Sequence, residues 1–164
     1  MTLTILILSF ILDGLFSNLI SINSIFYPLF TLISLIVIYP YYNNNKTFYK
    51  HALFIGLAYD LIYTNTMVFY AFVFVLAALI ISKLSILLTD NYVSLYIISI
   101  LSIIIFRLVT YLSIIITGNM KFDINLLFKS IYSSLIANLI YVIVLNELTK
   151  FISKKLRIRK NLRY

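Results

Sequence analysis

Three ionisable side chains lie inside apolar stretches of this sequence and are the first candidates for chemistry. Asp13, Asp60 and Arg107 each interrupt a run of hydrophobic residues. Two neighbouring carboxylates can form an aspartyl dyad, in which like-charge repulsion leaves a proton on one of them. Neither aspartate lies in a glycine-rich loop, however, and two carboxylates alone give little support for such a site. We therefore predict no catalytic residue and no enzymatic activity.

Other catalytic and metal-binding groups are scarce. The chain contains no cysteine and a single histidine, His51, which excludes cysteine nucleophiles, disulfides and metal sites of ordinary composition. His51 stands beside Lys50 at the expected edge of an apolar segment, where an interfacial role is more common than that of a general base. We predict neither a metal ion nor a cofactor.

Asp60 is the most informative of the three charges. Gly56 precedes it by four residues, so a close backbone contact and a carboxylate share one face of a helix. A carboxylate at membrane depth costs about 2.5–3.5 kcal/mol on insertion scales and persists only where it faces protein or water. We expect Asp60 to face the interior beside a tight turn and to accept a hydrogen bond from Thr64.

The composition indicates an integral membrane protein. Of the 164 residues, 63% are hydrophobic and 11% are charged. Soluble domains average roughly 45–50% apolar and about 25% charged residues. This excess of apolar surface cannot be hidden in the core of so small a chain.

Six apolar runs have about the length that crosses a hydrocarbon layer of ~30 Å. Pro28 opens the second run, and the short connection between the third and fourth predicts an antiparallel hairpin. The predicted fold is an all-α bundle of six transmembrane helices in residues 1–152, without an internal repeat, followed by a short basic tail in residues 153–164. The runs cover approximately residues 2–20, 25–42, 48–63, 67–88, 92–117 and 125–152.

Basic residues predict the orientation. Seven of the thirteen Lys and Arg residues lie in the last fifteen positions, and Lys46, Lys50 and Lys83 fall on the same predicted side. Because basic loops favour the cytoplasm, we predict a multi-pass protein of the cell membrane with both termini cytoplasmic. The tail is expected to contact membrane lipids through anionic headgroups. No nucleic acid partner is expected, because the tail is short and tied to a membrane helix.

Small polar residues recur every four positions in two of the runs. These stripes are Ser9, Asp13 and Ser17, and Ser130, Ser134 and Asn138. Such spacing lets helices approach closely and form hydrogen bonds between them, and we favour this interpretation over a proton or ion pathway. Arg107 is expected to pair with Asp60 or with Asp13, and the sequence does not choose between them.

The segment around Asp60 resembles the signature of the MreD family, the rod shape-determining membrane proteins of bacteria. That pattern has a glycine, three apolar residues, an aspartate, a short polar turn and a helix of small and apolar residues. Asn65 and Val68 depart from it, standing where family members often have glycine. The residues that match, in a form that resembles Gram-positive members, are Gly56, Tyr59, Asp60, Tyr63 and Thr64.

The resemblance implies a non-enzymatic component of the cell-elongation complex. Members of the family work with MreC, MreB, RodA and a class B penicillin-binding protein in lateral peptidoglycan synthesis. Their fold is similar to that of the substrate-binding subunits of energy-coupling-factor vitamin transporters, and such a subunit is the alternative function. It would need an outer pocket and an alanine-rich docking face on the first helix, where this chain has Ser9, Asp13 and Ser17.

A partner helix needs a surface of small or aromatic residues within the membrane, since lipid gives no hydrophobic drive between helices. The fourth run offers Ala71 and Ala78 beside Phe72. We predict this face as a candidate contact for MreC, a single-span protein in that family. The alternative is that these residues pack only within the bundle.

Overall fold

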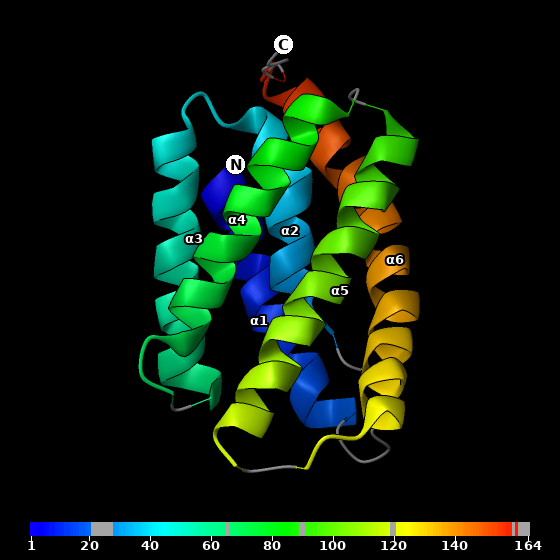
Figure 1. Cartoon of the computed structure of the whole chain (residues 1–164). Helices are drawn as coiled ribbons and strands as arrows, with labels where there is room; N and C mark the ends of the chain where they lie inside the picture. Colours follow the sequence, from blue (N-terminus) through cyan, green and yellow to red (C-terminus); the bar gives the residue numbers. More distant parts are fainter. Residues whose placement is uncertain (21–27, 65, 89–90, 119–120, 159, 161–164) are drawn as a thin grey trace.

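The chain folds into an up-and-down bundle of helices, shown in Figure 1. The computed structural model describes residues 1–20, 28–64, 66–88, 91–118, 121–158 and 160. A short 3-10 turn, η2 (Tyr39–Tyr41), extends the second helix, and a π-helical turn, η3 (Asp60–Thr64), extends the third. The helices are α1 (Thr2–Ile20), α2 (Phe30–Ile38), α3 (Asn45–Tyr59), α4 (Phe69–Leu87), α5 (Tyr92–Ile116) and α6 (Ile124–Lys155).

The described helices confirm the predicted all-α fold class. Three of them, α4, α5 and α6, are long and apolar enough to cross a membrane. Shorter apolar helices occupy Thr2–Ser17 and Phe30–Tyr41. The length and composition of the three long helices indicate a membrane protein.

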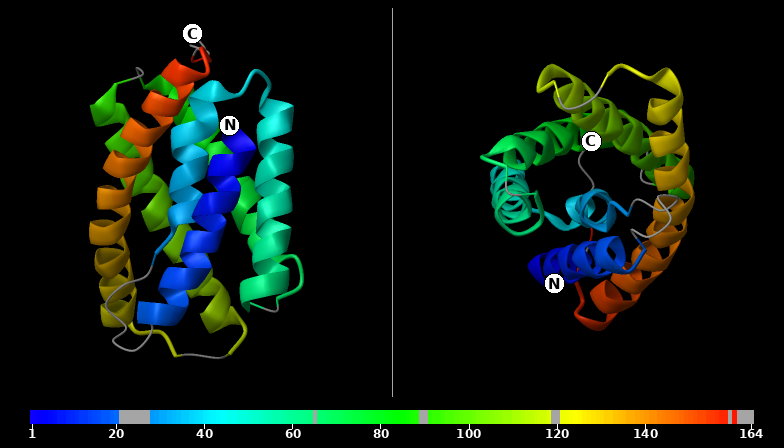
Figure 2. Two further views of the ribbon diagram at one scale, coloured as in Figure 1. Left: turned by 180° about the vertical axis from the view of Figure 1, so that it is seen from behind. Right: turned by 90° about the horizontal axis from the view of Figure 1, so that it is seen from below.

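Helix α2 lies at the centre of the bundle, as the right-hand view of Figure 2 shows. Every one of its residues is buried, and it packs against α1, α4, α5 and α6. A helix that is apolar on all sides is suited to such a position. Its nine residues rise roughly 14 Å, about half of the hydrocarbon thickness.

The start of α2 differs from the prediction. The second apolar run was expected to begin near Ile25, with Pro28 in the first turn, but the helix begins at Phe30, two residues beyond the proline. Ile25 itself lies outside the described residues. Side chains from two other helices determine this start, as described below.

Three other helices begin at side-chain caps. Asn44, Asn91 and Asp123 each accept a hydrogen bond from a backbone amide in the first turn of the helix that follows. Because of the first cap, α3 begins at Asn45, earlier than the expected position 48.

At the other end of the chain, α6 continues to Lys155, three residues into the predicted tail. Two basic residues of that tail, Arg159 and Arg163, lie outside the described residues.

Basic residues are concentrated at one end of the bundle. The start of α1, the end of α6, the connection between α2 and α3, and the end of α4 all lie toward one end in Figure 1. The turn between α3 and α4 lies at the opposite end. Basic residues from the predicted inner loops and from the tail are therefore grouped together.

Helix α3 packs chiefly against α4, and Gly56 lies where their backbones are closest. A Cβ atom on Gly56 would lie 2.5 Å from the Cα atom of Ala71 and 2.8 Å from the carbonyl oxygen of Tyr70. Both neighbours are backbone atoms of α4. Glycine is therefore required for this separation of the two helices.

We expect Gly56→Ala to destabilise the protein by about 1–3 kcal/mol, because the new methyl group would push α3 away from the α4 backbone. The measurement is the apparent melting temperature of the purified protein in detergent. Gly14→Ala is the comparison, since its added methyl group would meet the far end of the Tyr63 side chain rather than backbone. That side chain can turn away at the cost of one hydrogen bond to Phe10, so a smaller effect is expected. An equal effect of the two changes would contradict this account of the α3–α4 contact.

Candidate functional site

Asp60 holds the start of α4. Its side chain is only 2% exposed, and its two carboxylate oxygens accept hydrogen bonds from the backbone amides of Tyr70 and Ala71, both at 2.9 Å. The hydroxyl of Thr66 donates to the same carboxylate. Asp60 thus supplies acceptors to the first turn of a helix that begins nine residues later in the chain.

The expected donor, Thr64, does not contact the carboxylate directly. Its hydroxyl pairs with that of Thr66 at 2.8 Å, and Thr66 then donates to Asp60. The reason is the π-helical turn η3, which begins at Asp60 and changes the four-residue register that the prediction assumed. Such turns are frequent at functional sites.

Helix α4 depends on this distant cap because its own start is unfavourable. Val68, at the N-cap position, has a left-handed backbone with φ of 61° and supplies no side-chain hydrogen bond within the described residues. A β-branched residue in this region is strained. Glycine would adopt this conformation without strain.

Asp13 caps α2 in the same way. Its side chain is 1% exposed, and its oxygens accept hydrogen bonds from the amides of Phe30 at 2.6 Å and Thr31 at 2.9 Å. The Thr31 hydroxyl also donates to it. The preceding amide, of Leu29, donates to the Asn138 side chain of α6 at 2.8 Å. The first amides of α2 are therefore bound by side chains of α1 and α6.

The two aspartates give the first four helices an unexpected internal likeness. In each helical hairpin, a carboxylate from the first helix or its terminal turn binds two consecutive amides at the start of the next helix, together with one threonine hydroxyl. The sequence was expected to contain no repeat. The spacing conceals the likeness, because the carboxylate precedes its amides by 17 and 18 residues in one hairpin and by 10 and 11 in the other.

Two tyrosines close to Asp60 join the two hairpins. The hydroxyl of Tyr63 donates to the carbonyl oxygen of Phe10 on α1 at 2.7 Å, and the two rings lie 4.7 Å apart between centroids. Tyr59 contacts Phe10 on one side and Tyr70 of α4 on the other, at 6.0 and 5.1 Å. Aromatic pairs at these separations stabilise packing beyond their buried area.

Arg107 connects α5 to α6. Its Nε atom donates to the hydroxyl of Ser134 at 2.8 Å, and its charge acts electrostatically on Asp13 in α1 and on Tyr70 in α4. The polar stripe on α6 that the sequence predicts thus faces inward, with Ser134 and Asn138 fully buried.

The three residues of the candidate partner face on α4 do not point in the same direction. Ala71 and Ala78 are completely buried, so the prediction that they contact an outside helix is wrong. They face the interior, and the amide of Ala71 is one of those capped by Asp60. Phe72 points the other way and is 63% exposed. The face that a partner can reach is therefore the outer side of α4.

Sequence reasoning missed the residues that complete the caps. Asn138 belongs to a stripe that was predicted only to pack helices, and Thr31 and Thr66 were not singled out. Their partners are distant in sequence. The one available signal was an apolar helix whose start has no local capping residue, because such a helix needs acceptors from elsewhere in the chain. Among the described residues, no group of three His, Cys, Asp or Glu side chains is placed to hold a metal ion.

Comparison with known proteins gives no assignment. The chain matches no family model, no curated protein and no solved structure. The function must therefore be argued from the residues and their contacts.

We expect Asp60→Asn and Asp13→Asn each to destabilise the protein by about 1–3 kcal/mol. An asparagine keeps one acceptor oxygen but turns an NH2 donor toward the second backbone amide, which is left unsatisfied. The measurement is the fraction of protein that stays folded in detergent after heating.

Asp123→Asn is the matched control for these two changes. Asp123 caps α6 at an exposed position, where its Oδ1 accepts the amide of Asn125, and asparagine caps a helix about as well as aspartate. Little change is expected there. If all three variants lose the same stability, the distinction between buried and exposed caps does not hold.

Proposed function

We propose that this protein is a non-enzymatic membrane component of a bacterial cell-elongation complex, of the kind that the MreD family provides. One observation carries the proposal. Gly56 and Asp60, the two most specific residues of the family motif, act together on one contact, since Gly56 admits the α4 backbone and Asp60 binds the amides of Tyr70 and Ala71. The motif thus has a physical role that needs no substrate.

The proposal includes six membrane spans. Helices α1 and α2 are apolar but short. Helix α2 is enclosed by neighbours and suits the interior of a membrane bundle, whereas α1 turns an apolar face outward, where Leu8 and Leu15 are 52% and 53% exposed. Helix α3 packs along α4, which is long enough to cross. Lys46, Lys50 and Lys83 lie toward the end of the bundle that also holds the end of α6, and we assign this end to the cytoplasm.

Cysteine labelling tests this topology directly, because the chain contains no cysteine. Lys46→Cys and Met67→Cys introduce thiols at exposed positions on opposite ends of the bundle. We expect a membrane-impermeant maleimide to label Met67→Cys in intact cells and Lys46→Cys only after permeabilisation. The reverse pattern would overturn the assignment of the cytoplasmic end.

The partner surface in this proposal is the outer face of α4. Phe72 and Leu79 are 63% and 44% exposed, and because they are seven residues apart they lie on one side of the helix. A single membrane helix, such as that of MreC, can pack along this row. MreB, RodA and the class B penicillin-binding protein would join through the larger complex, and the lipids of the cell membrane surround it.

We expect the double change Phe72→Ala and Leu79→Ala to reduce the amount of MreC that co-purifies from detergent by roughly tenfold or more, since loss of two large anchors at an interface costs about 2 kcal/mol or more. The matched control is Ile136→Ala with Ile140→Ala, two exposed residues on α6. It should leave co-purification unchanged.

Two outcomes would contradict the proposed function. One is that the unmodified protein does not retain MreC. The other is that it binds a vitamin tightly in a thermal-shift screen, which would favour the substrate-binding subunit of an energy-coupling-factor transporter. If MreC is retained equally by both double variants, only the location of the surface is wrong.

A further inference from the structure

The turn between α3 and α4 exposes four large apolar side chains. Leu61 and Ile62 are 81% and 65% exposed, and Met67 and Val68 are 97% and 59% exposed. These four residues are referred to as the apolar turn. A group of exposed apolar side chains of this kind marks a surface that contacts lipid or another protein.

The polar groups beside the apolar turn bond to one another. The hydroxyl of Thr64 pairs with that of Thr66, which donates to the carboxylate of Asp60. The amides of Tyr70 and Ala71 donate to the same carboxylate. Non-helical backbone at membrane depth is tolerated only where its polar groups are satisfied within the protein or by water. These bonds therefore remove much of the cost of placing the turn in lipid.

The hairpin carries almost no charge between its basic end and the turn. Asp60 is the only Asp, Glu, Lys or Arg between Lys50 and Lys83, and its side chain is 2% exposed. The side chains that face outward along this hairpin are therefore uncharged from one lysine to the other.

The two arms of the hairpin are short compared with a membrane. Thr64, at the end of η3, is fourteen positions after Lys50, and Phe69, at the start of α4, is fourteen positions before Lys83. Each interval is about 21 Å of helix, against a hydrocarbon layer of ~30 Å. The lysine stems reach several Å toward the headgroups at the basic end, which brings the turn up to the opposite boundary of the hydrocarbon but not beyond it.

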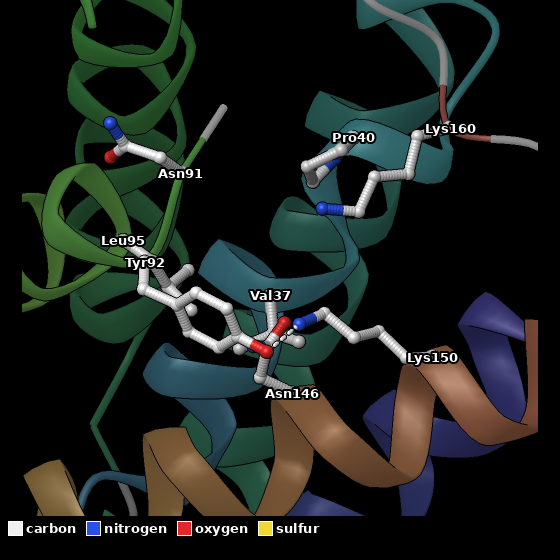
Figure 3. A pocket seen from close by; sticks show the side chains of 8 residues that line it. All are labelled: Val37, Pro40, Asn91, Tyr92, Leu95, Asn146, Lys150 and Lys160. Carbon is white, nitrogen blue, oxygen red and sulfur yellow. Dashed lines mark hydrogen bonds between the residues drawn. The ribbon is translucent and has the colours of Figure 1, made fainter. Parts of the chain in front are cut away.

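Helix α5 starts at the basic end and gives an independent measure of depth. Tyr92, its first residue, lies beneath the ammonium group of Lys150, which is 3.7 Å from the ring centroid and donates to the tyrosine hydroxyl (Figure 3). The end of α4 lies at the same end of the bundle in Figure 1. The lengths of α4 and α5 can therefore be compared from a common level.

The connection between α5 and α6 extends beyond the apolar turn. Helix α5 has 25 residues and α4 has 19, and the difference of six residues adds roughly 9 Å of helix. Figure 1 and the left-hand view of Figure 2 show this connection farther from the basic end than the α3–α4 turn. It carries Lys121 and Asp123, both exposed. Charged groups thus mark the water at this end, and the apolar turn stops short of them.

Lipid is the occupant that fits the apolar turn. Leu61 is seven positions after Phe54, which is 65% exposed, so the two side chains lie on about the same side of the hairpin. No charged residue separates them in the sequence except the buried Asp60. The apolar turn therefore continues the outer surface of the hairpin, which faces hydrocarbon in a membrane protein.

We propose that the apolar turn inserts into the lipid leaflet opposite the basic end of the bundle, with Leu61 and Ile62 among the acyl chains. Met67, at the tip, lies among the headgroups, where water-soluble reagents still reach it. The lysines at one end and the apolar turn at the other then hold the hairpin in both leaflets. The inference does not depend on the proposed role in cell elongation, because it concerns contacts with lipid alone.

Tryptophan fluorescence tests the depth of the turn, because the chain contains no tryptophan. Ile62→Trp places a single reporter in the apolar turn, and Phe122→Trp places one in the α5–α6 connection. The two original side chains are 65% and 66% exposed, so they form a matched pair. Each full-length variant is reconstituted alone into phosphatidylcholine vesicles. Quenching is measured with acrylamide on both sides of the membrane and with phosphatidylcholine that is brominated on its acyl chains.

We expect brominated lipid to quench Ile62→Trp at least about twofold more strongly than Phe122→Trp, since the two positions differ in depth by roughly 9 Å. Acrylamide should show the reverse order. Equal access of acrylamide to the two reporters would overturn the proposal. The same result is expected if a protein partner covers the turn instead of lipid, because these vesicles contain no partner.

Leu61→Trp provides a second reporter at a position that is 81% exposed. It should behave as Ile62→Trp does, because both side chains belong to the apolar turn. If Ile62→Trp fails to fold, the comparison of Leu61→Trp with Phe122→Trp decides the question alone. Stronger quenching of Leu61→Trp by acrylamide than by brominated lipid would also overturn the proposal.

Discussion

Backbone amides that begin a helix inside an apolar environment must find acceptors, and the rest of this structure depends on how that need is met. The first N–H groups of any helix have no partner within it, and in hydrocarbon each unsatisfied group costs several kcal/mol. Helices α2 and α4 both begin without a side-chain cap from their own N-cap residue, as far as the chain is described. Asp13 and Asp60 supply the missing acceptors. Each therefore fixes where a helix starts and how it is oriented against the helix before it.

This arrangement also explains why charged side chains are tolerated among so many apolar residues. The insertion of a carboxylate at membrane depth costs about 2.5–3.5 kcal/mol, but Asp60 binds two amides and a hydroxyl at the positive end of α4. Hydrogen bonds to a charged group contribute about 1.5–3 kcal/mol each, and the helix dipole adds to them. The charge is thus offset locally. The charge of Asp13 is offset in the same way, by two backbone amides and the Thr31 hydroxyl.

The sequence predicted the parts of this design that depend on spacing or composition. Apolar runs gave the helices, and the four-residue interval of Gly56 and Asp60 correctly indicated a close contact beside a buried carboxylate. The sequence did not predict the start of α2 at Phe30, because an apolar run does not reveal which backbone amide meets a side chain 17 residues away. Nor did it predict the burial of Ala71 and Ala78. Small residues suit an inner and an outer helix contact equally, and only the rotation of α4, set by Asp60, distinguishes the two.

Two asparagines of α6 meet the central helix α2 near its two ends. Asn138 and Asn146 are eight residues apart, roughly 12 Å along one face of the helix, and both are buried. Asn138 binds the amide of Leu29 just before α2. Asn146 lies near the other end of α2, beside Val37. At that end the backbone amides already bond within the helix. One face of α6 therefore presents two similar groups to the same central helix, and Asn138 binds the backbone amide just before that helix begins.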